Sequence, residues 1–435
     1  MAESTPATTA SPSLSSAFSP GYRTYVLILL LLVYTSNYAD RIVLGVLLEP
    51  IKAEFGVSDT LMGLLTGATF AIFYATLGIP IAILADRRSR RNIIGVCVFI
   101  WSGMTVLCGM AATFTQMMLA RIGVGVGEAG GSPPSHSMIS DLFPPDKRAT
   151  ALGIFAMGVP LGYLVGYYGG SVIAEDYGWR TAFYAMGVPG IILTLLVFFT
   201  VKEPPRGHHD FAAGSAAPSL TQIARYLGAR KSIVHMLIGA TLITFTGYSV
   251  VIWGPAFFIR THEMPLSQVG TYLSLVGGIS SMIGTFLGGY LADKLSRNDK
   301  RWQAWLVAIA IAIAIPFAVA VALLDDLETV LYINVIPSMV SALYLAPCFA
   351  MMQNLVEPRM RAVASATFLF VINLIGMGIG PVFTGWVSDL LAPTYGADSL
   401  RYAFVLLVVF NVWAIWHFVL AGRHLPADYA RVGQR

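Results

Sequence analysis

The sequence predicts an all-α membrane protein, with 12 transmembrane helices in two six-helix bundles related by pseudo-two-fold symmetry. Composition, apolar stretches and an internal repeat support this prediction. Of the 435 residues, 56% are hydrophobic and only 11% are charged, whereas a soluble domain carries about 25% charged residues. The mean hydropathy is +0.71. Such a chain cannot cover a surface exposed to water, so we expect it to lie in lipid.

Apolar stretches of about 20 residues predict membrane spans, because the hydrocarbon core is about 30 Å thick and a helix rises about 1.5 Å per residue. Twelve such stretches occur, at 24–48, 59–85, 92–112, 116–140, 148–173, 181–201, 232–257, 268–292, 303–324, 329–355, 362–391 and 402–421.

One long polar interruption, 202–231, divides the chain into two blocks of six predicted spans. We expect this cytoplasmic linker to carry a short amphipathic helix near 219–229 on the membrane surface. The predicted organisation has five parts: a disordered N-terminal tail at 1–22, the first bundle at 23–201, the linker at 202–231, the second bundle at 232–421 and a cytoplasmic tail at 422–435.

The distribution of basic residues predicts the orientation. With both termini in the cytoplasm, the cytoplasmic segments hold 21 of the 27 Lys and Arg residues. The opposite side holds four, namely Lys52, Arg180, Arg260 and Arg401. Cytoplasmic loops of membrane proteins are enriched in Lys and Arg, so we expect a multi-pass protein of the cell membrane with both termini cytoplasmic. The net charge of +4 is small and scattered, so we expect no nucleic-acid partner.

Three pairs of short segments reveal an internal repeat. LADRRSRR at 84–91 matches LADKLSR at 291–297, and their aspartates, Asp86 and Asp293, are 207 residues apart. PPDKRATA at 144–151 matches EPRMRAVA at 357–364, and WRTAF at 179–183 matches LRYAF at 400–404. Three matches in register indicate duplication of a six-helix unit, which is the architecture of a secondary transporter.

With these paired loops, and with Arg121 and Gly125 spaced as R-x-x-x-G, the sequence resembles the major facilitator superfamily over nearly its whole length. The resemblance implies the major facilitator fold. It also implies that two charged loops latch the halves together when the cytoplasmic gate is shut. The matching residues in this chain are Asp86, Arg87, Arg90, Arg91, Asp293, Lys294 and Arg297. An alternative is that the arginines only follow the charge bias of cytoplasmic loops, although this does not explain the aspartates.

A narrower resemblance involves NYADR at 37–41, RIGVGVGEA at 121–129 and DLFPPDKRA at 141–149. These segments are similar to those of spinster-type transporters, which move sphingosine-1-phosphate and lysophospholipids in animals. Related motifs also occur in organic-anion symporters of the same superfamily. The segment EAGGSPP after position 127 departs from the aromatic and hydroxyl residues that spinster relatives often carry there, which leaves the substrate open.

Four ionisable residues lie well inside predicted helices, and all are in the first half: Asp40, Arg41, Arg121 and Glu128. Ionisable groups within lipid are costly, so each is a candidate functional residue. We expect Arg41 or Arg121 to bind an anionic head group, because a guanidinium fits phosphate or carboxylate. Asp40 and Glu128 are the candidates for proton coupling. The alternative is a set of fixed ion pairs between the first and fourth helices.

The second half contains no comparable charge within its helices, and Asp389, near a helix end, is expected to be solvated. Polar and aromatic candidates for the substrate cavity are Asn37, Tyr248, Trp253, Gln353, Asn354 and Asn373. A charged half facing an apolar half suits an amphipathic substrate, whose head group would lie on the first half and whose tail would lie on the second.

The segment GVGEAG at 125–130 fits the G-x-G-x-x-G pattern of dinucleotide-binding turns, but it lies within a predicted span and follows no strand. Gly123, Gly127 and Gly131 are better explained as a small-residue stripe that lets another helix approach. The three cysteines lie in apolar runs, and no catalytic or metal-ligand spacing stands out. We therefore expect neither an enzyme nor a bound cofactor or metal.

The predicted function is secondary active transport by alternating access of an amphipathic anionic lipid-like substrate, a lysolipid or sphingoid phosphate, coupled to protons. The chain is expected to work in the bilayer as a monomer. A proton-coupled organic-anion symporter is the alternative within transport, and a non-transporting lipid receptor or scaffold is the alternative outside it.

Overall fold

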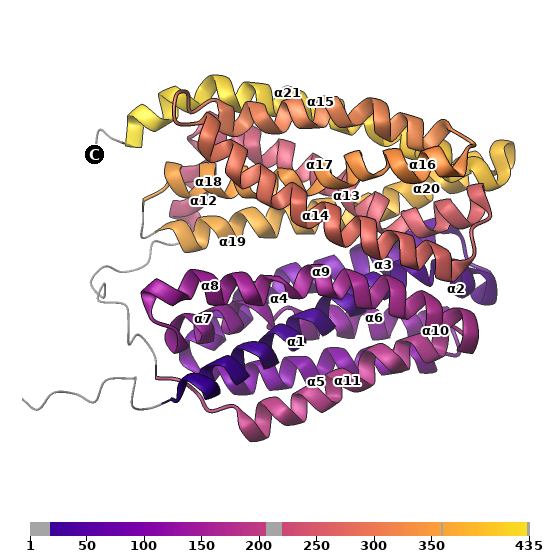
Figure 1. Ribbon diagram of the computed structural model, residues 1–435, viewed down its shortest axis with the longest axis horizontal. Coiled ribbons are helices and arrows are strands. Elements are labelled where there is room, and N and C mark those ends of the chain that lie inside the picture. The colour runs from indigo at the N-terminus through magenta and orange to yellow at the C-terminus, as the bar shows by residue number, and fades with distance from the viewer. Residues whose placement is uncertain (1–17, 206–219, 358–359, 433–435) are drawn as a thin grey trace, which may run out of the picture.

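The computed structural model describes residues 18–205, 220–357 and 360–432, and every regular element in this part of the chain is a helix. Figure 1 shows two helical bundles, the first half in indigo to pink and the second in salmon red to yellow. The all-helical fold class is thereby confirmed. Most of the predicted N-terminal tail and the middle of the predicted linker lie outside the described residues.

The first half contains α1 (Pro20–Val46), α2 (Leu48–Phe55), α3 (Asp59–Thr66), α4 (Ala68–Arg87), α5 (Arg90–Met110), α6 (Phe114–Glu128), α7 (Ser132–Leu142), α8 (Pro145–Ala156), α9 (Gly158–Tyr163), the π-helix η2 (Leu164–Gly169), α10 (Gly170–Tyr177) and α11 (Trp179–Thr200). A short linker helix, α12 (Leu220–Gly228), follows.

The second half contains α13 (Lys231–His262), α14 (Leu266–Leu295), α15 (Trp302–Leu323), α16 (Leu327–Ile333), α17 (Val335–Leu343), α18 (Leu345–Leu355), α19 (Arg361–Val371), the π-helix η4 (Ile372–Met377), α20 (Gly378–Tyr395), the 3-10 helix η5 (Gly396–Asp398) and α21 (Ser399–Val432).

Consecutive segments such as α3 and α4, or α16 to α18, continue one another, so the described helices form twelve rods at the predicted positions. Ten stretches within the described residues are long and apolar enough to cross a membrane, and the last, Val363–Arg431, contains two of the rods. The fourth rod is not among these stretches because it is interrupted between α6 and α7. The interruption is a feature that the apolar pattern alone does not predict.

Side-chain caps and glycines explain many helix ends. Ser19, Ser58, Ser89 and Thr113 each accept a hydrogen bond from the backbone N–H three residues later, which satisfies one of the unpaired donors of a helix start. Gly56, at the end of α2, has a φ of 62°, a left-handed conformation that glycine adopts without steric cost.

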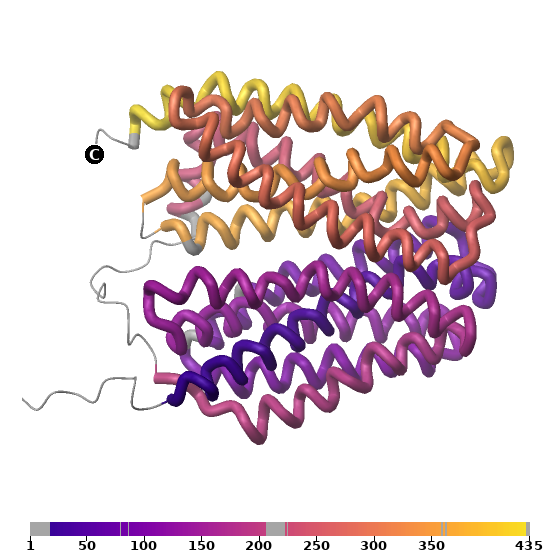
Figure 2. Tube along the Cα trace, viewed as in Figure 1, coloured from indigo at the N-terminus to yellow at the C-terminus, as the bar shows by residue number. Residues whose placement is uncertain are grey.

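The two ends of the molecule differ in which segments they expose. The chain enters α1 and leaves α21 at the same end, which also holds α12, as the trace in Figure 2 shows. We call this the linker end, and the opposite end, where α2 lies, the far end. The repeat pairs begin equivalent rods, since α8 and α19 start at matched segments and α11 and α21 do so as well.

The two halves pack closely toward the far end. There α3 lies against α20, α10 against α14 and α2 against α13, and α1 crosses α13 nearer the centre. One hydrophobic core combines residues of α1, α2 and α3 with Ile252, Trp253 and Ala256 of α13. A common core at this end fixes the relative position of the two halves in this structure.

The linker helix α12 packs against the second half. Ile223 and Leu227 are buried in the core of that half, and the Tyr226 hydroxyl donates a hydrogen bond to the Leu355 carbonyl. The apolar face that the sequence assigns to the membrane surface therefore covers protein in this structure.

Candidate functional site

Helices α1 and α6 hold Arg41 and Glu128 against each other in the first half. Arg41 Nε donates a hydrogen bond to Glu128 Oε2 at 2.5 Å, and its guanidinium lies 4.4 Å from the centroid of the Tyr74 ring and 5.2 Å from that of Tyr38. The Glu128 side chain is fully buried, whereas 11% of the Arg41 side chain is exposed. Arg41 is therefore the member of the pair that an arriving ligand can reach.

Asp40 and Arg121 lie deeper in the same bundle, where both are buried. Arg121 Nη1 donates to the Asp40 carbonyl oxygen at 3.3 Å. The Asp40 carboxylate interacts with the Thr105 hydroxyl, but among the described residues neither of its oxygens has a hydrogen bond of good geometry. The Asp40 carboxylate interacts electrostatically with the side chains of Glu128 and Arg121. The structure thus brings together all four charged residues singled out in the sequence.

The interruption of the fourth rod positions Glu128. Helix α6 ends at this residue, and α7 begins at Ser132 with prolines in its first turn. The C-terminal end of a helix carries a partial negative charge that disfavours a carboxylate, so the arrangement depends on Arg41. The predicted glycine stripe lies beside α5, since a Cβ at Gly127 would come 2.5 Å from the backbone nitrogen of Trp101.

A cavity of about 390 Å³ adjoins the charged residues, a size typical of small-molecule sites. Most of its wall comes from α13, α14, α15, α17 and α21 of the second half, and it is mainly aliphatic and aromatic. The first half contributes Tyr38, Val159, Tyr163 and Tyr167. Because Tyr38 lines the cavity and also contacts Arg41, the cavity and the ion pair are direct neighbours.

The predicted cavity residues of the second half are spread over different places. Tyr248 lines the cavity, as do Thr244 and Asn334, but Trp253, Gln353, Asn354 and Asn373 are not part of its wall. Trp253 is fully buried in the core that the two halves share. Gln353 and Asn354 are exposed near the linker end of α18, and Asn373 is half-buried on η4.

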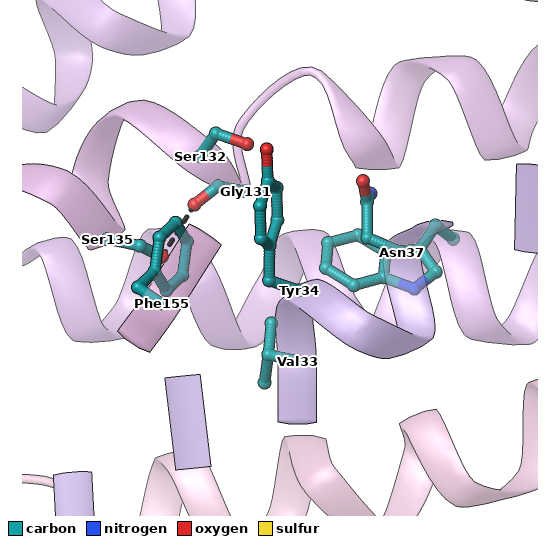
Figure 3. A pocket seen from close by; sticks show the side chains of 8 residues that line it. Val33, Tyr34, Asn37, Gly131, Ser132, Ser135 and Phe155 are labelled. Carbon is teal, nitrogen blue, oxygen red and sulfur yellow. Dashed lines mark hydrogen bonds between the residues drawn. The ribbon is translucent and has the colours of Figure 1, made fainter. Parts of the chain in front are cut away.

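Asn37 lies behind the ion pair rather than in the cavity. It interacts with Glu128 and lines a narrow crevice with Tyr34, Ser135 and Phe155, which has no room for a water molecule. In Figure 3 these side chains converge from α1, α7 and α8, and the Ser135 hydroxyl bonds to the Gly131 carbonyl. The stacked rings of Tyr34 and Phe155, 4.4 Å apart, help to close this route to Glu128.

The far end holds an ion network that sequence reasoning missed. Arg260 of α13 donates to both carboxylate oxygens of Asp59, at 2.7 and 2.8 Å, and to Glu49 at 2.6 and 2.9 Å. Lys52 Nζ adds a bond of 2.6 Å to Asp59, and the Asp59 side chain is only 3% exposed. We call these four residues the far-end network, and it joins the first half to the second.

Asp389 also contacts the other half, contrary to the expectation that it is solvated. Its carboxylate accepts bonds from the backbone N–H groups of Asp59 and Thr60, at 2.9 and 2.7 Å, and from the Thr60 hydroxyl at 2.6 Å. In the sequence, the charges of the far-end network and of Asp389 stand at the ends of predicted spans. Charged residues are common at such positions, so the position alone does not identify them.

The resemblance implies that the charged loops at the linker end latch the halves when the cytoplasmic gate is shut, and this prediction stays open. Arg90 is buried and bonds to Asp141, Ser137, Glu203 and the Pro204 carbonyl, all within the first half and the adjoining linker. The side chains of Arg87, Asp293, Lys294 and Arg297 are exposed. Arg91 donates its backbone N–H to Glu203, and the side chain of Asp86 lies outside what the structure describes.

Glu203 fixes the start of the linker to the α4–α5 loop. Its partial burial raises the pKa of the carboxyl, but the Arg91 backbone N–H, the Arg90 guanidinium and the Ser89 hydroxyl together lower that pKa below its usual value. The carboxylate is thus charged at neutral pH, and Arg90 remains bound to the first half.

A comparison with known proteins agrees with this architecture. Residues 30–381 match the model of the Major Facilitator Superfamily. The chain is 35% identical over 398 residues to an MFS-type efflux pump of Mycolicibacterium smegmatis, covering 91% of this chain and 92% of the relative. It is 28% identical over 403 residues to protein spinster homolog 1 of Mus musculus, covering 88% and 76% of the two chains.

A solved structure extends the likeness to three dimensions. The crystal structure of a bacterial homolog to the human lysosomal transporter spinster, in an inward-facing and unoccupied conformation, superposes with a TM-score of 0.88 at 34% identity, covering 94% of this chain and 99% of the other. The occupied inward-facing conformation gives a TM-score of 0.85. The protein is therefore a multi-pass membrane protein acting on small molecules, and the chain belongs to the major facilitator superfamily as a transporter of the spinster type.

Proposed function

We propose that this protein is a secondary active transporter that moves an amphipathic anionic lipid-like substrate, a lysolipid or sphingoid phosphate, by alternating access and with proton coupling. The observation that supports it most is the apolar cavity beside Arg41. An aliphatic tail fits among the apolar walls of the second half, and an anionic head group at Tyr38 would lie next to the guanidinium. A small hydrophilic substrate would leave most of this wall without a polar contact.

Proton coupling follows from the competition for Arg41. A head group that binds Arg41 draws it from Glu128, and a buried carboxylate without its counter-ion is strongly disfavoured. Uptake of a proton by Glu128 removes that penalty, so binding of the anion and of the proton support each other. Asp40, buried nearby without a hydrogen bond of good geometry among the described residues, is a second candidate acceptor.

The packing around Glu128 and Arg41 suggests by which route a proton reaches the ion pair. The crevice beside Asn37 has no room for water, and Arg41 retains some exposure. We therefore propose that protons reach Glu128 from the central cavity.

The far-end network suggests which state the structure represents. Because it ties the two halves together at the far end, and because the chain is similar to inward-facing structures, we propose a conformation closed at the far end. We assign the linker end to the cytoplasm of a cell-membrane protein, since most basic residues lie there. The two six-helix bundles would be the bodies that rock, within a monomer.

Transport by the purified protein in vesicles tests this function. Labelled lysolipid, a sphingoid phosphate and a short organic anion are compared with and without an imposed proton gradient. Gradient-driven uptake of the long-tailed anions is expected. Uptake of the short anion alone would instead identify an organic-anion symporter, and saturable binding without uptake of any of them would identify a receptor or scaffold.

A further inference from the structure

At the far end, each half contributes a carboxylate that caps a helix of the other half. Asp389 of α20 accepts two backbone N–H groups and one hydroxyl at the start of α3. Glu175 of α10 accepts the backbone N–H of Ser267, at the start of α14, at 2.6 Å. The first N–H groups of a helix have no partner within it, and an anion there also interacts favourably with the helix dipole.

The two contacts are related by the internal repeat. Thr60 and Ser267, whose backbone N–H groups are accepted, are 207 residues apart, the same spacing as Asp86 and Asp293. Both carboxylates lie in the last segment of the rod that starts at the second repeat pair, α10 in the first half and α20 in the second. By the 213-residue spacing of that pair, Asp389 aligns with Asp176, the residue next to Glu175. The halves thus use one arrangement twice, with the roles of donor and acceptor exchanged.

The helix starts differ in how far they depend on the opposite half. Helix α3 has its own cap, because the Ser58 hydroxyl accepts the Leu61 N–H. Helix α14 follows Pro265, which offers no capping side chain, so Glu175 supplies the cap from the other half. Asp59 and Glu49 at this end belong to the far-end network, whereas Asp325 contacts its own half through Arg401.

We propose that Asp389 and Glu175 are gating residues, a symmetric pair of helix caps that holds the far end closed and is released when it opens. We call them the paired caps. The proposal rests on the alternating access put forward above. Each cap is lost when the halves separate, so each favours the closed far end. The Asp389 cap adjoins the far-end network, because it binds the backbone of Asp59, whereas the Glu175 cap lies outside that network. Asp389 accepts three bonds and Glu175 one, so the two contributions are unequal.

Distances between spin labels test the paired caps in the full-length protein in vesicles. One pair of labels, at Tyr177 and Glu328, spans the far end, and a second pair, at Lys147 and Lys300, spans the linker end. All four positions are exposed. The three native cysteines are buried and are replaced by alanine in the labelled protein.

The variants are Asp389→Ala, Glu175→Ala and their combination, with Asp325→Ala as the matched control at the same end. Loss of a helix cap on replacement by alanine predicts a shift toward the open far end of roughly fivefold for each single variant, larger for Asp389→Ala. The shifts should multiply in the double variant, because the two caps share no partner. The control should keep the wild-type distances. The conservative variant Asp389→Glu, which keeps the carboxylate, should also keep them.

Unchanged far-end distances in both single variants would overturn the proposal. Glu175 is exposed, so Glu175→Ala remains informative if Asp389→Ala does not fold. Misfolding would broaden the distances at both ends. If the wild type shows a single distance with and without a proton gradient, alternating access itself is refuted. If the wild type alternates between two far-end distances and the variants show the same distances in the same proportions, only the paired caps are refuted.

Discussion

Replacing Glu128 by glutamine separates substrate binding from proton coupling. In the wild type, an anion must displace Glu128 from Arg41, to which it is bound at 2.5 Å. A hydrogen bond between charged groups contributes about 1.5–3 kcal/mol, which corresponds to roughly 10- to 100-fold in affinity. Glu128→Gln should therefore bind the anionic substrate roughly 10-fold more tightly or better, because the neutral amide competes weakly for Arg41.

The dependence on pH gives the same prediction a second readout. Protonation of Glu128 frees Arg41, so wild-type affinity for the anion should rise as the pH falls, whereas the variant should have high affinity throughout. Binding is measured with a labelled lysophosphatidate between about pH 8 and 5, conditions in which a phosphate keeps at least one negative charge. In vesicles, the variant should exchange substrate across the membrane but lose accumulation driven by a proton gradient.

The matched control is Glu54→Gln, which removes another carboxylate paired with an arginine, Arg180, at 2.6 Å. This pair lies at the far end and away from the cavity, so affinity and coupling should remain as in the wild type. The reasoning fails if Glu128→Gln still accumulates substrate with the gradient, or if its affinity is lower than that of the wild type at every pH. The first result would move coupling to another residue, and the second would mean that Glu128 contacts the substrate favourably.

Four further predictions use other parts of the molecule. Arg41→Ala should weaken binding of an anionic amphiphile at least tenfold without affecting a neutral one of equal tail length, as measured by equilibrium binding. Ala318→Phe, on the cavity wall, should slow vesicle uptake of long-tailed substrates more than short-tailed ones, whereas Ala312→Phe, on the exposed face of the same helix, should not. Arg260→Met removes the cation shared by two carboxylates and should favour the open far end roughly tenfold or more in label distances. The pKa of Glu203 is lowered by its contacts with the α4–α5 loop, so these contacts stabilise the fold at any pH above the usual pKa of a glutamate. This stabilisation is lost only as the pH falls through the lowered pKa. Backbone amides at the start of the linker should therefore show equal protection factors against hydrogen exchange at pH 8 and 5.

The fold could be predicted because its main determinants are local. A span is recognised from composition alone, and the matched loops around Asp86 and Asp293 show that six helices occur twice. The meeting of Arg41 with Glu128 was also predictable. Charges placed within lipid must find partners, and the first half offers few.

The cavity wall and the far-end network could not be predicted, because they depend on helix rotation and on contacts between distant segments. The helices of the second half are apolar on most sides, so the sequence gives no reason to turn Tyr248 toward the cavity and Trp253 toward the other half. Asp59 and Arg260 lie at the ends of spans, where charged residues are ordinary. Their partnership is visible only once α3 and α13 are placed side by side.

The position of these residues along two helices suggests how occupancy of the cavity reaches the far end. Tyr248 and Arg260 are both on α13, and twelve residues of helix correspond to about 18 Å. Helix α1 likewise carries Tyr38 and leads into α2, which holds Glu49. The two helices cross where a Cβ at Gly45 would lie 3.4 Å from the Ile252 carbonyl, so they are in close contact between the cavity and the network. Under the proposed alternating access, a substrate that separates Tyr38 from Tyr248 on one side of this crossing would act, along α13 and along α1 with α2, on the contact of Arg260 with Glu49 on the other.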